Sequence, residues 1–273
     1  MLSKICQMAL FTAVALSGQN ISSAIAETAV GPTVTDPHFH LAPGYLQPSE
    51  LPNSLVLLGP PPADGSAALA RDEAAREATM ALRGKARWDF ARKDADLQFP
   101  QPAMNFSCAM GADISEEKTP HLYRLMQRVL TDAGLSTYGI KNRYNRTRPF
   151  VVHNEGTCQP DEEAVLRQDG SYPSGHTAAG WAWALTLAEV NPKRADNLLE
   201  RGLSFGQSRV ICNAHWQSDV DGGRIMGAAT VAKLHSNPEF LADIQTARKE
   251  LETASSPAVD CAVENEVLSE QKR

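Results

Sequence analysis

The chain has 273 residues, of which 42% are hydrophobic, so it is long enough to bury a substantial core as one domain. Its formal net charge is -6, so it lacks the excess of basic residues that is typical of proteins that bind nucleic acid or anionic membranes, and the composition argues against both functions. Any anion-binding site must therefore be a local cluster of cations within an acidic protein, which is typical of an enzyme pocket.

Residues 1–26 have the form of a secretory signal peptide. A positive charge at Lys4 precedes an apolar run over residues 8–16, and Ala24-Ile25-Ala26 supplies the small residues of a cleavage site. We expect the mature chain to begin at Glu27 and to be periplasmic or secreted. No later apolar run approaches the ~20 residues that span a bilayer, so we expect no membrane partner once the signal is removed.

After Cys6 is lost with the signal, four cysteines remain, namely Cys108, Cys158, Cys212 and Cys261. An even number of cysteines in an exported protein predicts two disulfides, with about three pairings open. A zinc site is the weaker interpretation, because no two of the four have the close spacing of structural zinc ligands.

Residues 27–65 form an N-terminal arm with eight prolines and no sustained periodicity, which predicts an irregular but packed segment. Within it, His38 and His40 have a spacing that metal ligands can adopt. Because no other ligand lies nearby in the sequence, two polar surface histidines are the favoured interpretation. Residues 66–253 then make up the predicted domain, and residues 254–273 a polar C-terminal tail.

The predicted domain is helical throughout. Residues 66–95 favour helix with a break at Gly84, Cys108 falls in an expected loop, and residues 151–172 are expected to be a polar surface excursion. Further helices are expected over residues 119–134, 135–144, 178–190, 193–212, 218–235 and 237–253, the last of which ends the fold. Few segments alternate with the period of a strand, so the fold class is an all-α bundle of roughly eight to ten helices.

Two segments combine cations or a histidine with backbone features that suit an oxyanion. Lys141 and Arg148 are seven residues apart, so two turns of helix would place both on one side. Pro173-Ser174-Gly175-His176 precedes an apolar helix, whose free amide groups and positive dipole end favour an anion.

A third segment runs from Ser208 to Asp219 and contains an arginine, a histidine and an aspartate. Arg209 carries a forked, permanently charged guanidinium that suits phosphate. If His215 opens or lies within a helix, Asp219 follows one turn later, where its carboxylate can select the tautomer of the imidazole.

Together these segments resemble the three-part signature of the phosphatidic acid phosphatase type 2 superfamily, which includes vanadium haloperoxidases. The signature reads Lys-x6-Arg-Pro, Pro-Ser-Gly-His and Ser-Arg-x5-His-x3-Asp, and it is matched here by residues 141–149, 173–176 and 208–219. The stretch from Gly170 to Thr177 is similar to the signature of bacterial class A non-specific acid phosphatases.

The resemblance implies an acid phosphatase that hydrolyses small phosphomonoesters without a metal or another cofactor. It makes His215 the nucleophile and Asp219 the group that orients it, while His176 protonates the leaving alcohol and later activates water. The implied phosphate-binding residues are Lys141, Arg148, Ser174, Gly175 and Arg209. Tyr172, next to the second segment, is a candidate substrate-pocket residue.

Two other functions fit parts of the pattern. A vanadium-dependent haloperoxidase would hold vanadate in the same site, but the smaller size of the chain and the class A signature disfavour it. A non-catalytic periplasmic phosphate-binding module would need the cations but not His215. The sequence leaves open the physiological substrate and whether the chain forms a homo-oligomer.

Residues outside the three segments are expected to be structural. His121, His153 and His235 have no motif around them, so we expect them to be exposed or to serve the fold. The tryptophans at 181, 183 and 216 are expected in the core. Cys212 is expected in a disulfide that holds the third segment, rather than as a reactive thiol.

Overall fold

The computed structural model describes residues 41–270, so the expected signal peptide and the pair His38 and His40 lie outside the described residues. Within this range the chain is all α-helical and has no strand, which confirms the predicted fold class. The first helices are α1 (Ser54–Leu57), α2 (Ala67–Met80), α3 (Ala86–Ala95), α4 (Gln101–Met110), α5 (Pro120–Leu135), α6 (Tyr138–Tyr144), α7 (Pro149–Val152), the 3-10 helix η1 (Pro160–Glu162) and α8 (Glu163–Leu166). The second group is α9 (Gly175–Val190), the 3-10 helix η2 (Pro192–Arg194), α10 (Ala195–Ile211), α11 (Gln217–Leu234), α12 (Pro238–Leu251) and α13 (Cys261–Glu270).

Local sequence signals explain several helix boundaries. The Ser66 hydroxyl accepts a hydrogen bond from the Leu69 amide and caps α2, and Gly84 separates α2 from α3 with a positive φ of 72°. The side chain of Asn237 caps α12 in the same way, with proline at the first helical position. These breaks and caps confirm the helix starts that the sequence predicts there.

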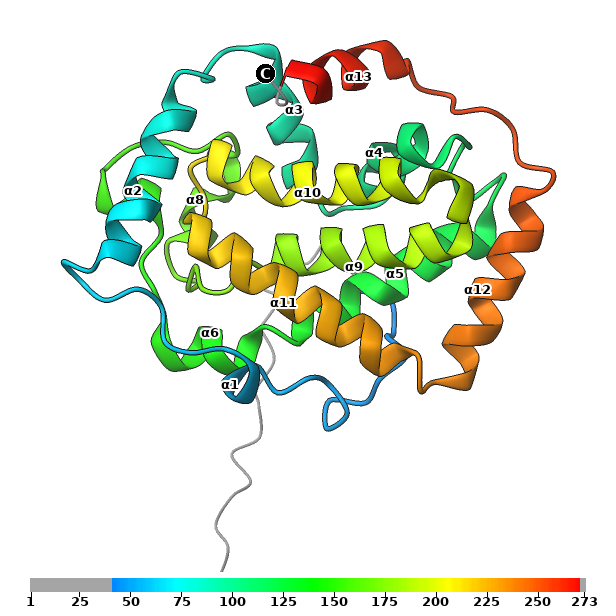
Figure 1. Ribbon diagram of the computed structural model, residues 1–273, viewed down its shortest axis with the longest axis horizontal. Coiled ribbons are helices and arrows are strands. Elements are labelled where there is room, and N and C mark those ends of the chain that lie inside the picture. The colour runs from blue at the N-terminus through cyan, green and yellow to red at the C-terminus, as the bar shows by residue number, and fades with distance from the viewer. Residues whose placement is uncertain (1–40, 271–273) are drawn as a thin grey trace, which may run out of the picture.

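Helix α9 is the centre of the fold. Figure 1 shows it between α10 and α11, with α5 behind it and α12 across one end of the layer. Its apolar residues face neighbours on nearly all sides, and Trp183 is fully buried. Helix α11 can approach because Gly223 and Gly227 lack side chains: a Cβ there would lie 2.6 Å from the Ser174 carbonyl oxygen and 2.5 Å from that of Ala178.

All four cysteines of the described range are paired, which confirms two disulfides. Cys108 bonds to Cys261, and Cys158 bonds to Cys212. The expected loop around Cys108 is wrong, because this residue lies in α4, which ends at the left-handed Gly111.

The polar C-terminal tail contains a helix that was not expected, α13, after α12. Its Val267 is buried, and its Glu264 carboxylate lies 3.7 Å from the fully buried guanidinium of Arg201. Helix α13 therefore docks on the bundle through one apolar residue, one ion pair and one disulfide, which explains how so polar a segment becomes part of the fold. None of the helices in residues 41–270 combines the length and apolar character needed to cross a membrane.

The segment over residues 151–172 lies largely at the surface, as expected, but part of it is buried. It contains η1 and α8, and both Leu166 and the disulfide-bonded Cys158 are buried. This segment packs beside the motif residues, so it forms one wall of the candidate site.

Candidate active site

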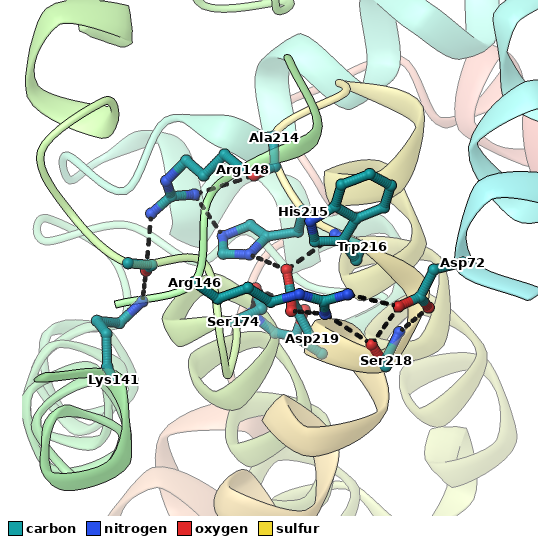
Figure 2. Close-up of polar contacts among 12 residues, drawn as sticks. Asp72, Lys141, Arg146, Arg148, Ser174, Ala214, His215, Trp216, Ser218 and Asp219 are labelled. Atoms are coloured by element: carbon teal, nitrogen blue, oxygen red, sulfur yellow. Dashed lines mark hydrogen bonds and ion pairs between the residues drawn. The ribbon is translucent and has the colours of Figure 1, made fainter. Parts of the chain in front are cut away.

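The three motifs meet where the start of α9, the end of α10 and the start of α11 come together, and the segment between α6 and α7 closes the group. Figure 2 shows the side chains that these elements direct towards one another. Lys141, Arg148, Ser174, His215 and Asp219 are all buried, and Arg209 is fully buried as well. Most of these residues carry charge, so their burial is costly unless they pair with one another or with a ligand.

His215 and Asp219 form the expected pair, although His215 lies in the turn before α11 rather than in a helix. Asp219 is in the first turn of α11, and its Oδ2 lies 3.3 Å from Nδ1 of His215 while accepting a bond from the Trp216 amide at 2.8 Å. On the other side of the ring, a guanidinium nitrogen of Arg148 lies 3.0 Å from Nε2. A carboxylate only accepts and a guanidinium only donates, so the proton sits on Nδ1 and Nε2 keeps its lone pair.

Arg146 binds the carboxylate oxygen of Asp219 that does not contact His215, and the sequence motifs did not predict this role. Its guanidinium donates to Asp219 Oδ1 at 2.6 Å and to Oδ2 of Asp72, on α2, at 2.8 Å, as Figure 2 shows. Asp72 also accepts from the backbone amide and the hydroxyl of Ser218. Both carboxylates are fully buried, so Arg146 is the cation that balances two buried anions.

Lys141 and Arg148 meet, but not along one helix as expected. Helix α6 ends at Tyr144, and Arg148 is the N-cap residue of α7 after an extended turn. Both residues bind the same backbone and carboxylate: Lys141 Nζ donates to the Gly170 carbonyl at 2.6 Å and lies 3.6 Å from Asp169, while Arg148 donates to Asp169 at 2.8 Å. The segment from α8 to α9 therefore brings the two cations together.

Arg209, on α10, is the least satisfied cation of the site. One of its terminal nitrogens donates to Oε1 of Gln159 at 2.9 Å, whereas Nε and Nη2 are buried without a hydrogen-bond partner in residues 41–270. Burial, together with repulsion from Arg148, lowers the pKa of Arg209 to about 9. A buried guanidinium with two unpaired nitrogens is suited to an anionic ligand.

The second motif opens α9 as expected. The Ser174 hydroxyl accepts bonds from the backbone and the hydroxyl of Thr177, so its own proton is left to donate. Gly175 lies in the first turn, where backbone amides have no partner within the helix. Nε2 of His176 lies 2.9 Å from the Ala95 carbonyl oxygen, which can only accept, so this nitrogen carries a proton.

The electrostatics of the site favour neutral imidazoles. Burial lowers the pKa of His215 well below its usual value, and Arg148, Arg209 and Lys141 lower it further. Burial and Arg209 likewise lower the pKa of His176. Burial also lowers the pKa of Lys141 to about 8. A cluster that holds its histidines neutral and its cations close together attracts negative charge.

Tyr172, beside the second motif, and Ser208, the first residue of the third motif, form hydrogen bonds outside the cation cluster. The hydroxyl of Tyr172 donates to the Gly59 carbonyl at 3.1 Å, so it tethers the N-terminal arm beside the site. Ser208 bonds to the buried Asp94 at 2.5 Å and accepts from Arg87 at 2.9 Å, which places it in a charged network under α10.

The other expected structural residues have such roles. His153 pairs with Glu73, His235 pairs with Glu189, and the Trp216 ring nitrogen donates to the Thr147 carbonyl. Within the described part of the chain, no three histidine, cysteine, aspartate or glutamate side chains are grouped as metal ligands.

The fold and the site together define a class: an all-helical protein in which a buried histidine–aspartate pair faces a cluster of cations able to hold a tetrahedral oxyanion. The chain belongs to the PAP2 superfamily, whose family model matches residues 126–240. This range contains all three motifs.

Three relatives extend the match over most of the chain. A non-specific acid phosphatase of Providencia stuartii is 47% identical over 207 residues, which cover 76% of this chain and 84% of the relative. A non-specific acid phosphatase of Salmonella typhimurium is 45% identical over 76% of this chain and 83% of the relative. An acid phosphatase of Zymomonas mobilis is 39% identical over 93% of this chain and 92% of the relative.

Proposed function

We propose that the protein is a broad-specificity acid phosphatase that hydrolyses small phosphomonoesters through a phosphohistidine at His215. The observation that carries this proposal is the neutral His215 imidazole, whose Nε2 lone pair lies beside Arg148 while Asp219 accepts from the opposite nitrogen. Relatives that are named acid phosphatases, at 39–47% identity, support the same activity.

In the first step, Nε2 of His215 attacks phosphorus and the bond from phosphorus to the ester oxygen breaks. The leaving alkoxide takes a proton from His176, so an alcohol departs. The imidazole of His215 becomes cationic as it bonds to phosphorus, and the Asp219 carboxylate stabilises that charge. Asp219 is therefore needed in the reaction as well as for the choice of tautomer.

The phosphoryl oxygens are held by groups that are in place before the reaction. Lys141, Arg148 and Arg209 supply three positive charges, and Ser174 and Gly175 add a hydroxyl and a backbone donor at the positive end of α9. Fixed cations and donors stabilise the charge that spreads over these oxygens during in-line displacement.

In the second step, His176 takes a proton from water, and the resulting nucleophile attacks phosphorus from the side that the alcohol left. The bond to Nε2 of His215 breaks, inorganic phosphate forms, and both histidines return to their starting protonation states.

The pKa shifts explain why such a site works in acid. A lowered pKa keeps His215 unprotonated, and hence nucleophilic, below the usual titration range of histidine. A bound phosphate dianion brings negative charge next to His176, which opposes the effect of Arg209 and favours the protonated acid. Activity is therefore expected on the acid side of neutrality.

The variant His215→Ala separates an enzyme from a phosphate-binding module. We expect hydrolysis of p-nitrophenyl phosphate to fall by at least about 10³-fold, because the nucleophile is removed. Phosphate binding, measured by calorimetry, should persist, because the three cations remain. A variant that hydrolyses the ester as fast as the wild type would refute the proposal.

We also propose that the protein works outside the cytoplasm. The pairing of Cys108, Cys158, Cys212 and Cys261 into two disulfides supports an oxidising compartment, in keeping with the signal-like residues 1–26. Fractionation of a Gram-negative host that expresses the full chain should release it with the periplasm, and retention in the cytoplasm would contradict this location.

A further inference from the structure

Gln159 lies next to the phosphate-binding cluster and belongs to none of the three motifs. Its Oε1 accepts a hydrogen bond from Arg209 at 2.9 Å, and its Nε2 donates to the Ala95 carbonyl at 3.0 Å. The two partners fix the orientation of the amide, since a guanidinium can only donate and a carbonyl can only accept. Gln159 thus joins α10, which carries Arg209, to the end of α3.

The same Ala95 carbonyl oxygen is the partner of His176 Nε2, at 2.9 Å. One acceptor therefore binds both the side chain that holds Arg209 and the proposed proton donor. Through Gln159 and Ala95, Arg209 and His176 are linked by three hydrogen bonds. A shift of the Gln159 amide would disturb both.

The backbone on either side holds Gln159 in place. Its neighbour Cys158 forms the disulfide to Cys212, three residues after Arg209, and donates its amide to the Cys212 carbonyl at 3.3 Å. The backbone amide of Gln159 donates to the Thr157 hydroxyl at 3.0 Å. The disulfide thus ties the segment carrying Gln159 to the end of the helix that carries Arg209.

We infer that Gln159 is a positioning residue. It orients the Arg209 guanidinium towards the phosphate, and it fixes the Ala95 carbonyl oxygen that accepts the hydrogen bond from His176. This inference rests on the proposed function. The amide suits the role because it is neutral: it accepts one bond from Arg209 and leaves the charge of the guanidinium for the ligand. A carboxylate at the same position would neutralise that charge and could not donate to Ala95 unless protonated.

The test compares Gln159→Glu and Gln159→Leu with the wild type. A matched control is Gln245→Glu, since Gln245 accepts from Arg248 at 3.4 Å on the exposed surface of α12. Phosphate binding is measured directly by calorimetry at pH 6, and thermal unfolding reports whether each variant is folded.

We expect Gln159→Glu to weaken phosphate binding by at least about tenfold and Gln159→Leu by about three- to tenfold, the scale of one ordinary hydrogen bond, because Gln159 acts on the phosphate only through Arg209. Gln245→Glu should bind as the wild type does. The loss of kcat/KM should also be larger for an alkyl phosphate than for p-nitrophenyl phosphate, because only the poorer leaving group depends strongly on His176.

Three outcomes would contradict these proposals. If the wild type binds phosphate and both folded Gln159 variants bind it within twofold as tightly, Gln159 does not position Arg209 and the inference is wrong. If the two folded variants lose the same factor of kcat/KM for both esters, Gln159 does not act through His176, and that part of the inference is wrong. If the wild type neither binds phosphate nor hydrolyses its esters, the proposed function itself fails.

Discussion

Replacing Arg146 by lysine should reduce catalysis without unfolding the protein. Arg146 donates to Asp219 at 2.6 Å, to the Ser218 hydroxyl at 2.8 Å and to Asp72 at 2.8 Å. A lysine keeps the positive charge but has one nitrogen, which cannot follow the fork of the guanidinium to both carboxylates.

The magnitude follows from the donors that remain. Without the fork, Asp72 keeps the amide and hydroxyl of Ser218, and Asp219 keeps the Trp216 amide and the ring nitrogen of His215. The loss is then about one charge-assisted hydrogen bond, or about 1.5–3 kcal/mol. If that loss falls on Asp219, kcat should drop by about 10- to 100-fold, because His215 is no longer held for attack. Arg146→Ala should lower kcat further and also reduce stability, since it leaves two buried carboxylates without a cation.

The assay is steady-state hydrolysis of p-nitrophenyl phosphate across pH, with thermal unfolding in parallel. Arg143→Lys is the matched control, because it makes the same arginine-to-lysine change at an exposed residue of α6, the helix that carries Lys141. The expected result is a fall in kcat for Arg146→Lys with a small change in KM, since the phosphate-binding cations are untouched. Wild-type kcat and an unchanged pH profile for a folded Arg146→Lys would refute the role of Arg146 in holding Asp219.

Three further predictions concern charge, disulfides and inhibitors. Because the pKa of Lys141 is lowered to about 8, the inhibition constant for phosphate should rise as pH increases through that value, and Lys141→Met should bind weakly at every pH without this inflection. The double change Cys108→Ser with Cys261→Ser should lower the free energy of unfolding by up to about 5 kcal/mol, because this disulfide closes a long loop. Activity at 25 °C should change little, since α4 and α13 carry no site residue, and equal melting temperatures for the variant and the wild type would contradict this prediction. Hydrolysis should persist in EDTA and be inhibited strongly by micromolar vanadate, which mimics the trigonal bipyramidal transition state, and the opposite response to either reagent would count against a metal-free phosphohistidine site.

Much of the helical fold is readable from local signals. Thr119-Pro120 and Asn237-Pro238 place proline in the first turn of α5 and α12, and Gly84 ends a helix-favouring stretch. Each of these signals acts on residues within a few positions of it, so the helix boundaries can be predicted from the sequence alone. Helix α13 has a local start signal in Asp260, whose side chain accepts from the Ala262 amide, but the packing of this helix depends on a disulfide and a buried ion pair with distant partners.

The site could be predicted only as far as its motifs reach. The spacing of His215 and Asp219 indicates a pair, and their atoms meet as that spacing suggests. By contrast, nothing near Arg146 in the sequence points to Asp72, since that contact depends on how α2 packs on α11. Lys141 and Arg148 were expected on one helical face, but they meet through Asp169 because the chain turns between α6 and α7.

One signal for Arg146 was available in the sequence. It lies two residues before Arg148, which the first motif places at the site, and a buried arginine needs a carboxylate partner. Gln159 carried no such signal, because its importance comes from its place beside the disulfide that joins Cys158 to Cys212.

The central claim is that His215 forms a covalent bond to phosphorus, and rapid quenching tests it most directly. The protein is mixed with a radiolabelled phosphomonoester at acid pH, quenched in alkali, where phosphohistidine survives, and digested for peptide mapping. We predict an acid-labile label on the peptide that contains His215, and no label in His215→Ala. A wild-type protein that turns over the ester but carries label on another residue, or none under conditions that trap a known phosphohistidine, would contradict the mechanism.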